Sequence, residues 1–207
     1  MRVKNVVLAV GAHPDDIEMG CGGALAKHLE VGDEVYCLVL TNGERGNHSL
    51  GREECLVSSK LLGLKDIFFG GFTDGFLTDD FETVNLIEGF INKLGVNRVY
   101  THSPHDRHQD HRNCSRAVSS AARKITEILF FQGPSTTTFE PHYFIQLSDG
   151  HFEKKISSVR CYKSQIGKGV VDPRWLTNLA ELNGAMCNEK YAEAFAVNHI
   201  IRGKNDV

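Results

Sequence analysis

Uninterrupted apolar runs recur along the chain, and they predict strands that are covered on both faces of a sheet. The two clearest are Val6-Val7-Leu8-Ala9-Val10 and Val35-Tyr36-Cys37-Leu38-Val39-Leu40. Shorter β-branched and aromatic runs follow at intervals that leave room for a helix between them. The predicted strands are Val3–Val10, Glu34–Leu40, Ile67–Phe69, Asn97–Thr101, Ile128–Phe131 and His142–Leu147.

Between these runs the apolar residues change to a helical period. Cys21, Leu25 and Leu29 share one face of the first such segment. Glycine at position 63 is expected to end the second, and Asp110 to cap the fourth. The predicted helices are Cys21–Val31, Arg52–Leu62, Asp80–Leu94, His111–Lys124, Phe152–Gln165 and Pro173–Asn183.

Strands that alternate with helices predict βαβ units and an α/β fold with a mostly parallel sheet. At 207 residues the chain is expected to be a single domain, with 202–207 as a frayed tail. In such folds ligands bind beyond the carboxyl ends of the strands, where the strand order reverses. The loops that follow the first, second and fourth strands are therefore where we expect the chemistry.

The first of these loops carries Ala12-His13-Pro14-Asp15-Asp16. Burying a histidine and two carboxylates at the end of a strand is costly unless the groups are paired or bind a metal. Adjacent carboxylates also repel each other unless a cation lies between them. Pro14 fixes its own backbone and restricts His13, so the segment is predicted to be a rigid turn. The pattern indicates one half of a metal site.

The other half is predicted in the segment 102–111, which holds four of the ten histidines. His13 and Asp16 together with His111 would supply two nitrogens and one carboxylate. Three protein ligands and a water are the pattern of a catalytic zinc site. His108 lies three residues before His111 and can share its face. Iron or another first-row divalent ion fits the same ligands.

Asp15 is not expected to share the ion with Asp16, because neighbouring residues in a turn point apart. Placed over the metal-bound water, it would act as the general base when that water attacks an amide carbonyl. His108 is a candidate acid for the leaving nitrogen, with Asp110 holding its ring. In the alternative, Asp15 makes both proton transfers. Arg52, a cation at a helix start, is either a substrate contact or an ordinary solvated arginine.

The composition of the chain limits the classes of partner and the cellular location that we expect. A net charge of −3 and the lack of any lysine or arginine run argue against a general nucleic-acid binder. No apolar run reaches the roughly 18 residues of a membrane span. The N-terminus lacks the apolar core of a signal peptide, and none of the six cysteines forms a Cys-x-x-Cys pair. We therefore expect reduced thiols and a cytoplasmic location.

The two motifs together, Ala12-His13-Pro14-Asp15-Asp16 and His108-Gln109-Asp110-His111, resemble those of the PIG-L or LmbE-like family of metal-dependent N-deacetylases. The resemblance implies a Rossmann-like three-layer fold and zinc held by His13, Asp16 and His111. It also implies Asp15 as the base, His108 and Asp110 as an assisting pair, and Arg52 as a substrate contact. Implied substrates carry N-acetylglucosamine, and relatives often form trimers or hexamers.

Two alternatives to an N-acetylglucosamine deacetylase stay open at this point. The chain could be an amidase that acts on a larger thiol-sugar conjugate. It could also be a Rossmann-like protein that binds a metal or nucleotide without turnover. The segment Gly20-Cys21-Gly22-Gly23 does not support a dinucleotide site, because Leu25 stands where that motif needs its third glycine. The sequence assigns no role to the segment around Gln132–His142.

Overall fold

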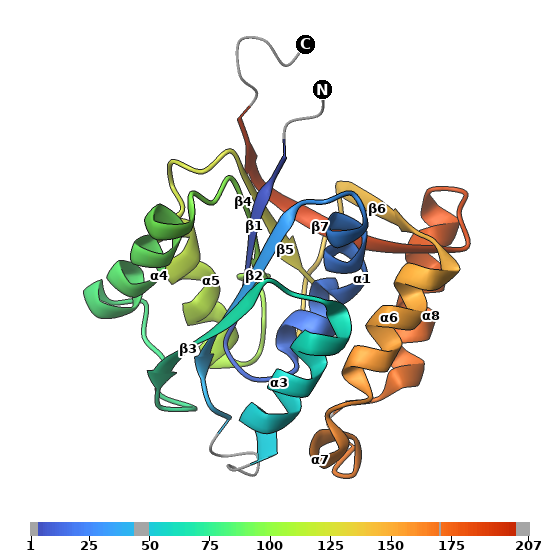
Figure 1. Cartoon of the computed structure of the whole chain (residues 1–207), viewed down its shortest axis with the longest axis horizontal. Coiled ribbons are helices and arrows are strands. Elements are labelled where there is room, and N and C mark those ends of the chain that lie inside the picture. The colour runs from blue at the N-terminus through green and yellow to red at the C-terminus, as the bar shows by residue number, and fades with distance from the viewer. Residues whose placement is uncertain (1–3, 44–49, 170, 202–207) are drawn as a thin grey trace.

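The computed structural model describes residues 4–43, 50–169 and 171–201, which build one seven-stranded sheet with helices on both faces (Figure 1). The expected tail at 202–207 lies outside the described residues. Neighbouring strands follow the order β3-β2-β1-β4-β5-β7-β6. The strands are β1 (Val6–Gly11), β2 (Glu34–Thr41), β3 (Asp66–Phe72), β4 (Arg98–His102), β5 (Glu127–Phe131), β6 (Tyr143–Leu147) and β7 (Tyr191–Ile200).

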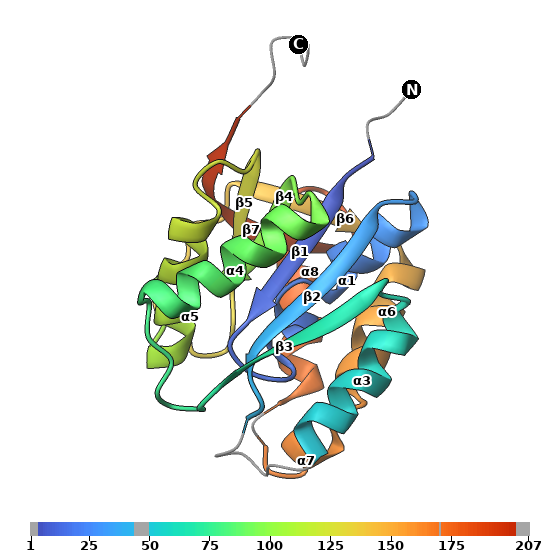
Figure 2. The same cartoon turned by 60° about the vertical axis from the view of Figure 1, so that its left-hand side comes forward.

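Strands β1 to β5 pair in parallel, and only β6 and β7 join the sheet antiparallel. The α/β fold with a mostly parallel sheet is thus confirmed. Helices α4 (Phe81–Leu94) and α5 (Gln109–Ala121) cover one face of the sheet (Figure 2). The other face carries α1 (Asp16–Glu30), α3 (Leu50–Leu62), α6 (Asp149–Val159), α7 (Lys163–Ile166) and α8 (Pro173–Met186).

The core is divided by the sheet, as the strand pattern requires. Leu8 and Val10 of β1 are fully buried against the α4 and α5 side. Val7 and Ala9 are fully buried on the opposite side, which α1 covers. Successive side chains of a strand alternate between faces, so a strand with helices on both sides has to be apolar throughout. No helix in the described part of the chain has the length and hydrophobicity that crossing a membrane requires.

The strand order places the reversal between β1 and β4. The chain moves from β1 outward through β2 to β3, and it then returns to the other side of β1 with β4 and β5. Loops that leave β1 and β4 therefore diverge at the carboxyl edge of the sheet and leave a crevice between them. The predicted location of the chemistry matches this topology.

Helix α1 begins at Asp16, five residues before the predicted start at Cys21. The predicted helix left out Gly20, which lies inside α1. Glycine is needed there for close packing, because a Cβ atom at Gly20 would lie 2.2 Å from the ring of Phe131. The helix is kinked at Cys21, whose φ is −143° and ψ is 15°.

Helix α5 also starts earlier than predicted, at Gln109, and its N-cap is His108 rather than Asp110. The His108 ring nitrogen Nδ1 accepts a hydrogen bond from the backbone N–H of Asp110 at 3.2 Å. The carboxylate of Asp110 is thereby free to point into the first turn, and this changes its role in the site.

Two further differences lie in the second half of the chain. The predicted helix Phe152–Gln165 is two helices, because α6 ends at Val159 and Tyr162 turns inward to full burial. The Tyr162 hydroxyl donates to Glu18 at 2.8 Å. Strand β7 was not predicted; it pairs with β5 and β6, so its position depends on partners that are distant in sequence.

Candidate metal centre

A cavity of about 810 Å³ opens at the carboxyl edge of the sheet. Its lining comes from the loops after β1 to β5 and from α1, α3, α5 and α7. Both predicted motifs contribute: His13, Asp15 and Asp16 line it from one side, and His108 and His111 from the other. Segments almost a hundred residues apart thus meet in one hollow of a size typical for small-molecule sites.

Three of these side chains converge on a common point. His13 Nδ1 is 3.2 Å from His111 Nε2 and 3.3 Å from Asp16 Oδ2. His111 Nε2 is 3.4 Å from Asp16 Oδ1. Ligand atoms about 2.0 Å from a tetrahedral zinc ion lie about 3.3 Å from one another, so this trio has the spacing of a zinc ligand set. His13, Asp16 and His111 therefore fit a divalent ion.

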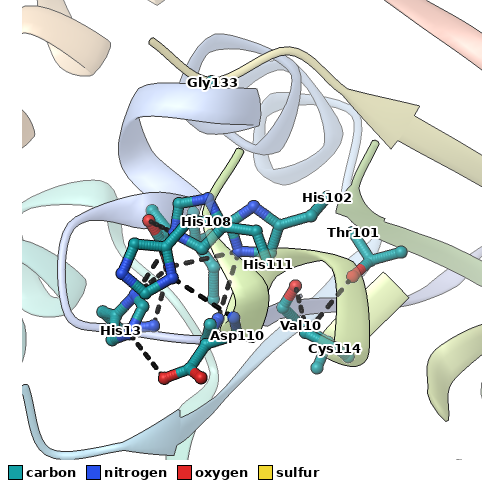
Figure 3. Close-up of polar contacts among 12 residues, drawn as sticks. Val10, His13, Thr101, His102, His108, Asp110, His111, Cys114 and Gly133 are labelled. Atoms are coloured by element: carbon teal, nitrogen blue, oxygen red, sulfur yellow. Dashed lines mark hydrogen bonds and ion pairs between the residues drawn. The ribbon is translucent and has the colours of Figure 1, made fainter. Parts of the chain in front are cut away.

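The site offers more donor atoms than one ion needs. Three overlapping sets have donor atoms within 4.8 Å of one another: His13, His108 and His111; Asp16, His102 and His111; and His13, Asp74 and Asp110. The sets share members, so they describe one crowded centre. Figure 3 shows His108 and His111 projecting from the start of α5 toward His13. The His111 ring is stacked between His102 and His108, with centroid distances of 4.1 Å and 4.6 Å.

The contacts of one ring nitrogen of His13, Nε2, indicate that the other nitrogen, Nδ1, faces the candidate ion position. Nε2 lies 3.2 Å from Asp110 Oδ2 and 3.2 Å from Asp74 Oδ1. Burial acts to lower the pKa of His13, but hydrogen bonds to Asp110, Asp16 and Asp74 outweigh it and raise that pKa well above its usual value. A carboxylate behind the distal nitrogen is the usual support of a metal-binding imidazole. Nδ1 is thus left for the ion.

This contact changes the expected partner of Asp110. Its carboxylate accepts from Gly75 N at 2.6 Å and contacts His13, so the carboxylate supports a candidate ligand rather than the ring of His108. Its other oxygen, Oδ1, is buried and has no hydrogen-bond partner among the residues that the structure describes. Asp110 and His108 remain linked only through the backbone N–H at the helix cap.

Both oxygens of the Asp16 carboxylate contact histidines of the candidate metal centre. Its carboxylate accepts from the backbone N–H of His13 at 2.7 Å and lies 3.1 Å from His102 Nε2. Burial alone would raise the pKa of Asp16, but the charges of His111 and His102 and the hydrogen bonds from His102 and His13 lower it well below its usual value. His102 has its pKa lowered to about 4 by burial and by the charge of His111, so this ring is neutral at pH 7.

Asp15 differs from Asp16 both in its hydrogen bonding and in the direction in which its pKa is shifted. Its φ of 93° places it in the left-handed region, a conformation that costs on the order of 1–3 kcal/mol outside glycine. Its carboxylate lines the cavity and has no hydrogen bond to any described residue. Burial, and then the charge of Asp16, raise the pKa of Asp15 well above its usual value. A raised pKa and a free carboxylate are what a general base requires.

Two of the predicted site residues, Asp110 and Arg52, are not among the residues that line the cavity, and of these Asp110 still contacts the centre through His13. Arg52 packs on an aromatic ring instead. Its guanidinium carbon lies 4.1 Å from the centroid of the Phe69 ring. The arginine among the described lining residues is Arg107. The role of Arg52 stays a prediction.

Sequence reasoning overlooked several residues of the centre. Asp74 directly follows β3, so the rule that placed the other motifs at strand ends would have found it. Asp106 lies inside the histidine segment, and its pKa is lowered because hydrogen bonds from His111 and Ser135 outweigh burial. Ser135 and Gln165 also line the cavity, and no pattern in the sequence marks either of them.

Comparison with known proteins identifies relatives of the whole arrangement. The family model PIG-L, described as GlcNAc-PI de-N-acetylase, matches residues 8–122. The uncharacterized deacetylase YaiS of Escherichia coli is 33% identical over 167 residues, which cover 76% of this chain and 90% of YaiS. Diacetylchitobiose deacetylase of Thermococcus kodakarensis is 30% identical over 216 residues, covering 90% of this chain and 80% of that protein.

A solved structure shows that the fold alone does not decide the reaction. The 4-carboxy-2-hydroxymuconate hydratase of Pseudomonas putida superposes with a TM-score of 0.85 and covers 98% of this chain and 99% of its own. It is 21% identical, so the likeness is one of fold. The choice between hydrolysis and hydration has to come from the site.

Proposed function

The chain belongs to the PIG-L family of de-N-acetylases, and from this premise we propose that it is a metal-dependent hydrolase that removes the acetyl group from an N-acetylglucosamine-type substrate. One observation carries the proposal: His13, Asp16 and His111 have the mutual spacing of a zinc ligand set, and the carboxylate of Asp15, which has no hydrogen bond to a described residue, lines the same cavity. The relatives that are named deacetylases support the reaction type.

His13 Nδ1, Asp16 and His111 Nε2 would hold the ion, which is zinc in the proposal, with Fe²⁺ as the alternative that the same ligands accept. When bound, the ion supplies Lewis acidity, which polarises the amide carbonyl and lowers the pKa of water. Asp110 and Asp74 keep the His13 ring oriented through Nε2. The ligand geometry is therefore set by the protein.

Asp15 takes the proton of the water that adds to the amide carbonyl. Its raised pKa favours the carboxylic acid so formed, which can then return the proton to the leaving nitrogen. The conformation at Asp15 aims the carboxylate into the cavity, while Asp16, the next residue, turns to the ligand set. The same pair of adjacent carboxylates thus performs two tasks.

His108 faces the cavity in one tautomer. Because its Nδ1 accepts from the backbone N–H of Asp110, the ring proton is on Nε2. Burial, and then the charges of His111 and His13, lower the pKa of His108. A neutral ring with a proton on Nε2 donates one hydrogen bond to the reacting amide. This state favours Asp15 as the source of the proton on the leaving nitrogen.

The substrate panel that tests the proposal uses zinc-loaded protein and measures released acetate and free amine. It includes N-acetylglucosamine, N,N'-diacetylchitobiose and a thiol-sugar conjugate with a larger acyl group. Acetate and amine in equal amounts from an N-acetylated sugar support the proposal. Turnover of the conjugate alone would show that the enzyme is an amidase that acts on a larger thiol-sugar conjugate. Metal binding without release of acetate from any substrate would contradict the proposal.

A further inference from the structure

The carboxylate of Asp106 joins the metal centre to the loop Gly133–Thr137. Its side chain is 1% exposed, and Oδ1 lies 3.3 Å from Nδ1 of His111. The same oxygen accepts from the hydroxyl of Ser135 at 2.5 Å and from the backbone N–H of His108 at 2.8 Å. Oδ2 accepts from the hydroxyl of Thr136 at 3.1 Å. Both carboxylate oxygens are thus occupied by the histidine segment and the loop.

Backbone pairing holds the two segments side by side. Arg107 N donates to Ser135 O at 3.0 Å, and Thr137 N donates to His105 O at 2.8 Å. Asp106 and Thr136 form an antiparallel bridge between these two hydrogen bonds. Ser135, at one end of the paired stretch, and Pro134, the residue before it, line the cavity. The cavity wall is therefore fixed to the segment that carries His111.

The carboxylate also decides which nitrogen of His111 is available. An ionised carboxylate can only accept hydrogen bonds, so the nitrogen of His111 that faces Asp106, Nδ1, is the one that carries a proton when His111 binds an ion through Nε2. Nε2 is then a lone pair directed at His13 and Asp16, at 3.2 Å and 3.4 Å. Without Asp106 both tautomers of His111 would be available and the ring could rotate.

We propose that Asp106 is a positioning residue that fixes His111 for metal binding and couples the affinity of the centre to the loop Gly133–Thr137. The inference rests on the proposed function only in requiring that His111 binds the ion through Nε2. The proposal gives a role to this loop, to which the sequence assigned none. The hydroxyls of Ser135 and Thr136 donate hydrogen bonds to Asp106, and these bonds also hold the loop in place as a wall of the cavity.

Zinc affinity, measured by competition with a chromophoric chelator, tests the first part. Asp106→Asn is expected to weaken zinc binding by about 10- to 100-fold, the usual effect of removing such a support. The matched control is Asp33→Asn, because Asp33 Oδ2 lies 2.6 Å from His28 Nδ1 in a buried pair far from the centre. The control should lower the melting temperature and leave zinc affinity unchanged. Cobalt-loaded protein should show altered visible absorption bands in Asp106→Asn and unaltered bands in the control.

Ser135→Ala tests the coupling to the loop, and it also decides the matter if the Asp106 variant does not fold. Losing one hydrogen bond to the carboxylate should weaken zinc binding by about 3- to 10-fold. Hydrogen exchange gives an independent readout. Zinc should slow exchange at the amides of Arg107 and Thr137 in the unaltered protein, and Ser135→Ala should reduce this effect, while the amide of Ala122 at the far end of α5 should not respond.

The outcomes separate the inference from the function on which it rests. If the unaltered protein binds no divalent ion, the proposed function fails. If it binds zinc and both Asp106→Asn and Ser135→Ala bind it within twofold of the same affinity, the function stands and the positioning role of Asp106 is wrong. If affinity falls equally in Asp33→Asn, the effect is one of general stability, and the inference is also overturned.

Discussion

His13 Nδ1 lies 3.2 Å from His111 Nε2, although 98 positions separate the two residues in the sequence. Both nitrogens also approach the carboxylate of Asp16. The supporting carboxylates occupy the other nitrogen of each ring, Asp110 on His13 and Asp106 on His111. The two facing nitrogens and the Asp16 carboxylate thus surround one position that fits a divalent cation.

Removing the ion should therefore destabilise the protein. Because an ion that binds only the folded state adds stability by mass action, zinc at 100 times its dissociation constant should contribute about 2.7 kcal/mol. Thermal unfolding in a chelator, then with zinc restored in excess, measures this effect together with acetate release. A melting temperature that does not respond to zinc would contradict the metal centre.

Asp15→Asn should abolish most turnover without disturbing the metal. Asparagine tolerates the left-handed backbone found at position 15, so the turn should survive the change. It cannot take up a proton, and losing a general base costs about 10²- to 10⁴-fold in kcat. Metal content and kcat are measured on the same sample. Normal turnover with full metal content would show that Asp15 is not the base.

Arg52→Ala tests a contact that the sequence predicts and the cavity lining does not include. If Arg52 binds the part of the substrate beyond the sugar, the variant should raise KM for a large substrate by about 10-fold, the effect of one charge-assisted hydrogen bond. KM for N-acetylglucosamine itself, kcat and zinc affinity should stay unchanged. Unchanged KM values for every substrate would mean that Arg52 only packs on Phe69.

The sequence predicted that His13, Asp16 and His111 lie together because two kinds of information in it are simple to use: a local turn and the topology of parallel strands. His13 to Asp16 form one turn after one strand, and parallel strands bring their carboxyl ends to one edge. The pairing of Asp110 with His108 could not be predicted from proximity in the chain. Residues two apart at a helix start do not face each other, so Asp110 turns to His13 instead. Strand β7 escaped prediction because its pairing with β5 and β6 is not local.

Asp33 should make stability depend on pH below pH 4. Burial acts to raise its pKa, but hydrogen bonds from His28 and Asn5 outweigh it and lower the folded pKa below the usual 3.8. The carboxylate therefore stabilises the fold above pH 3.8, and this contribution is lost as the pH falls through the folded pKa. Asp33→Asn should cost about 1.5–3 kcal/mol at pH 7. Urea unfolding of both proteins from pH 7 to pH 3 should show the difference shrinking only in the acid range.

The packing of α1 against β5 gives the last prediction, with a control in the same chain. A Cβ atom at Gly20 would lie 2.2 Å from the buried Phe131 ring, so Gly20→Ala forces the helix or the ring to move and should cost about 1–3 kcal/mol. Gly89 in α4 has nothing within 4 Å of the same added atom. Alanine there only removes the entropy cost of a helical glycine, and Gly89→Ala should stabilise the protein by about 0.5–1 kcal/mol. Free energies of unfolding in urea compare the two. If Gly20→Ala were as stable as Gly89→Ala, the close approach of α1 to the Phe131 ring would not be a packing constraint on position 20.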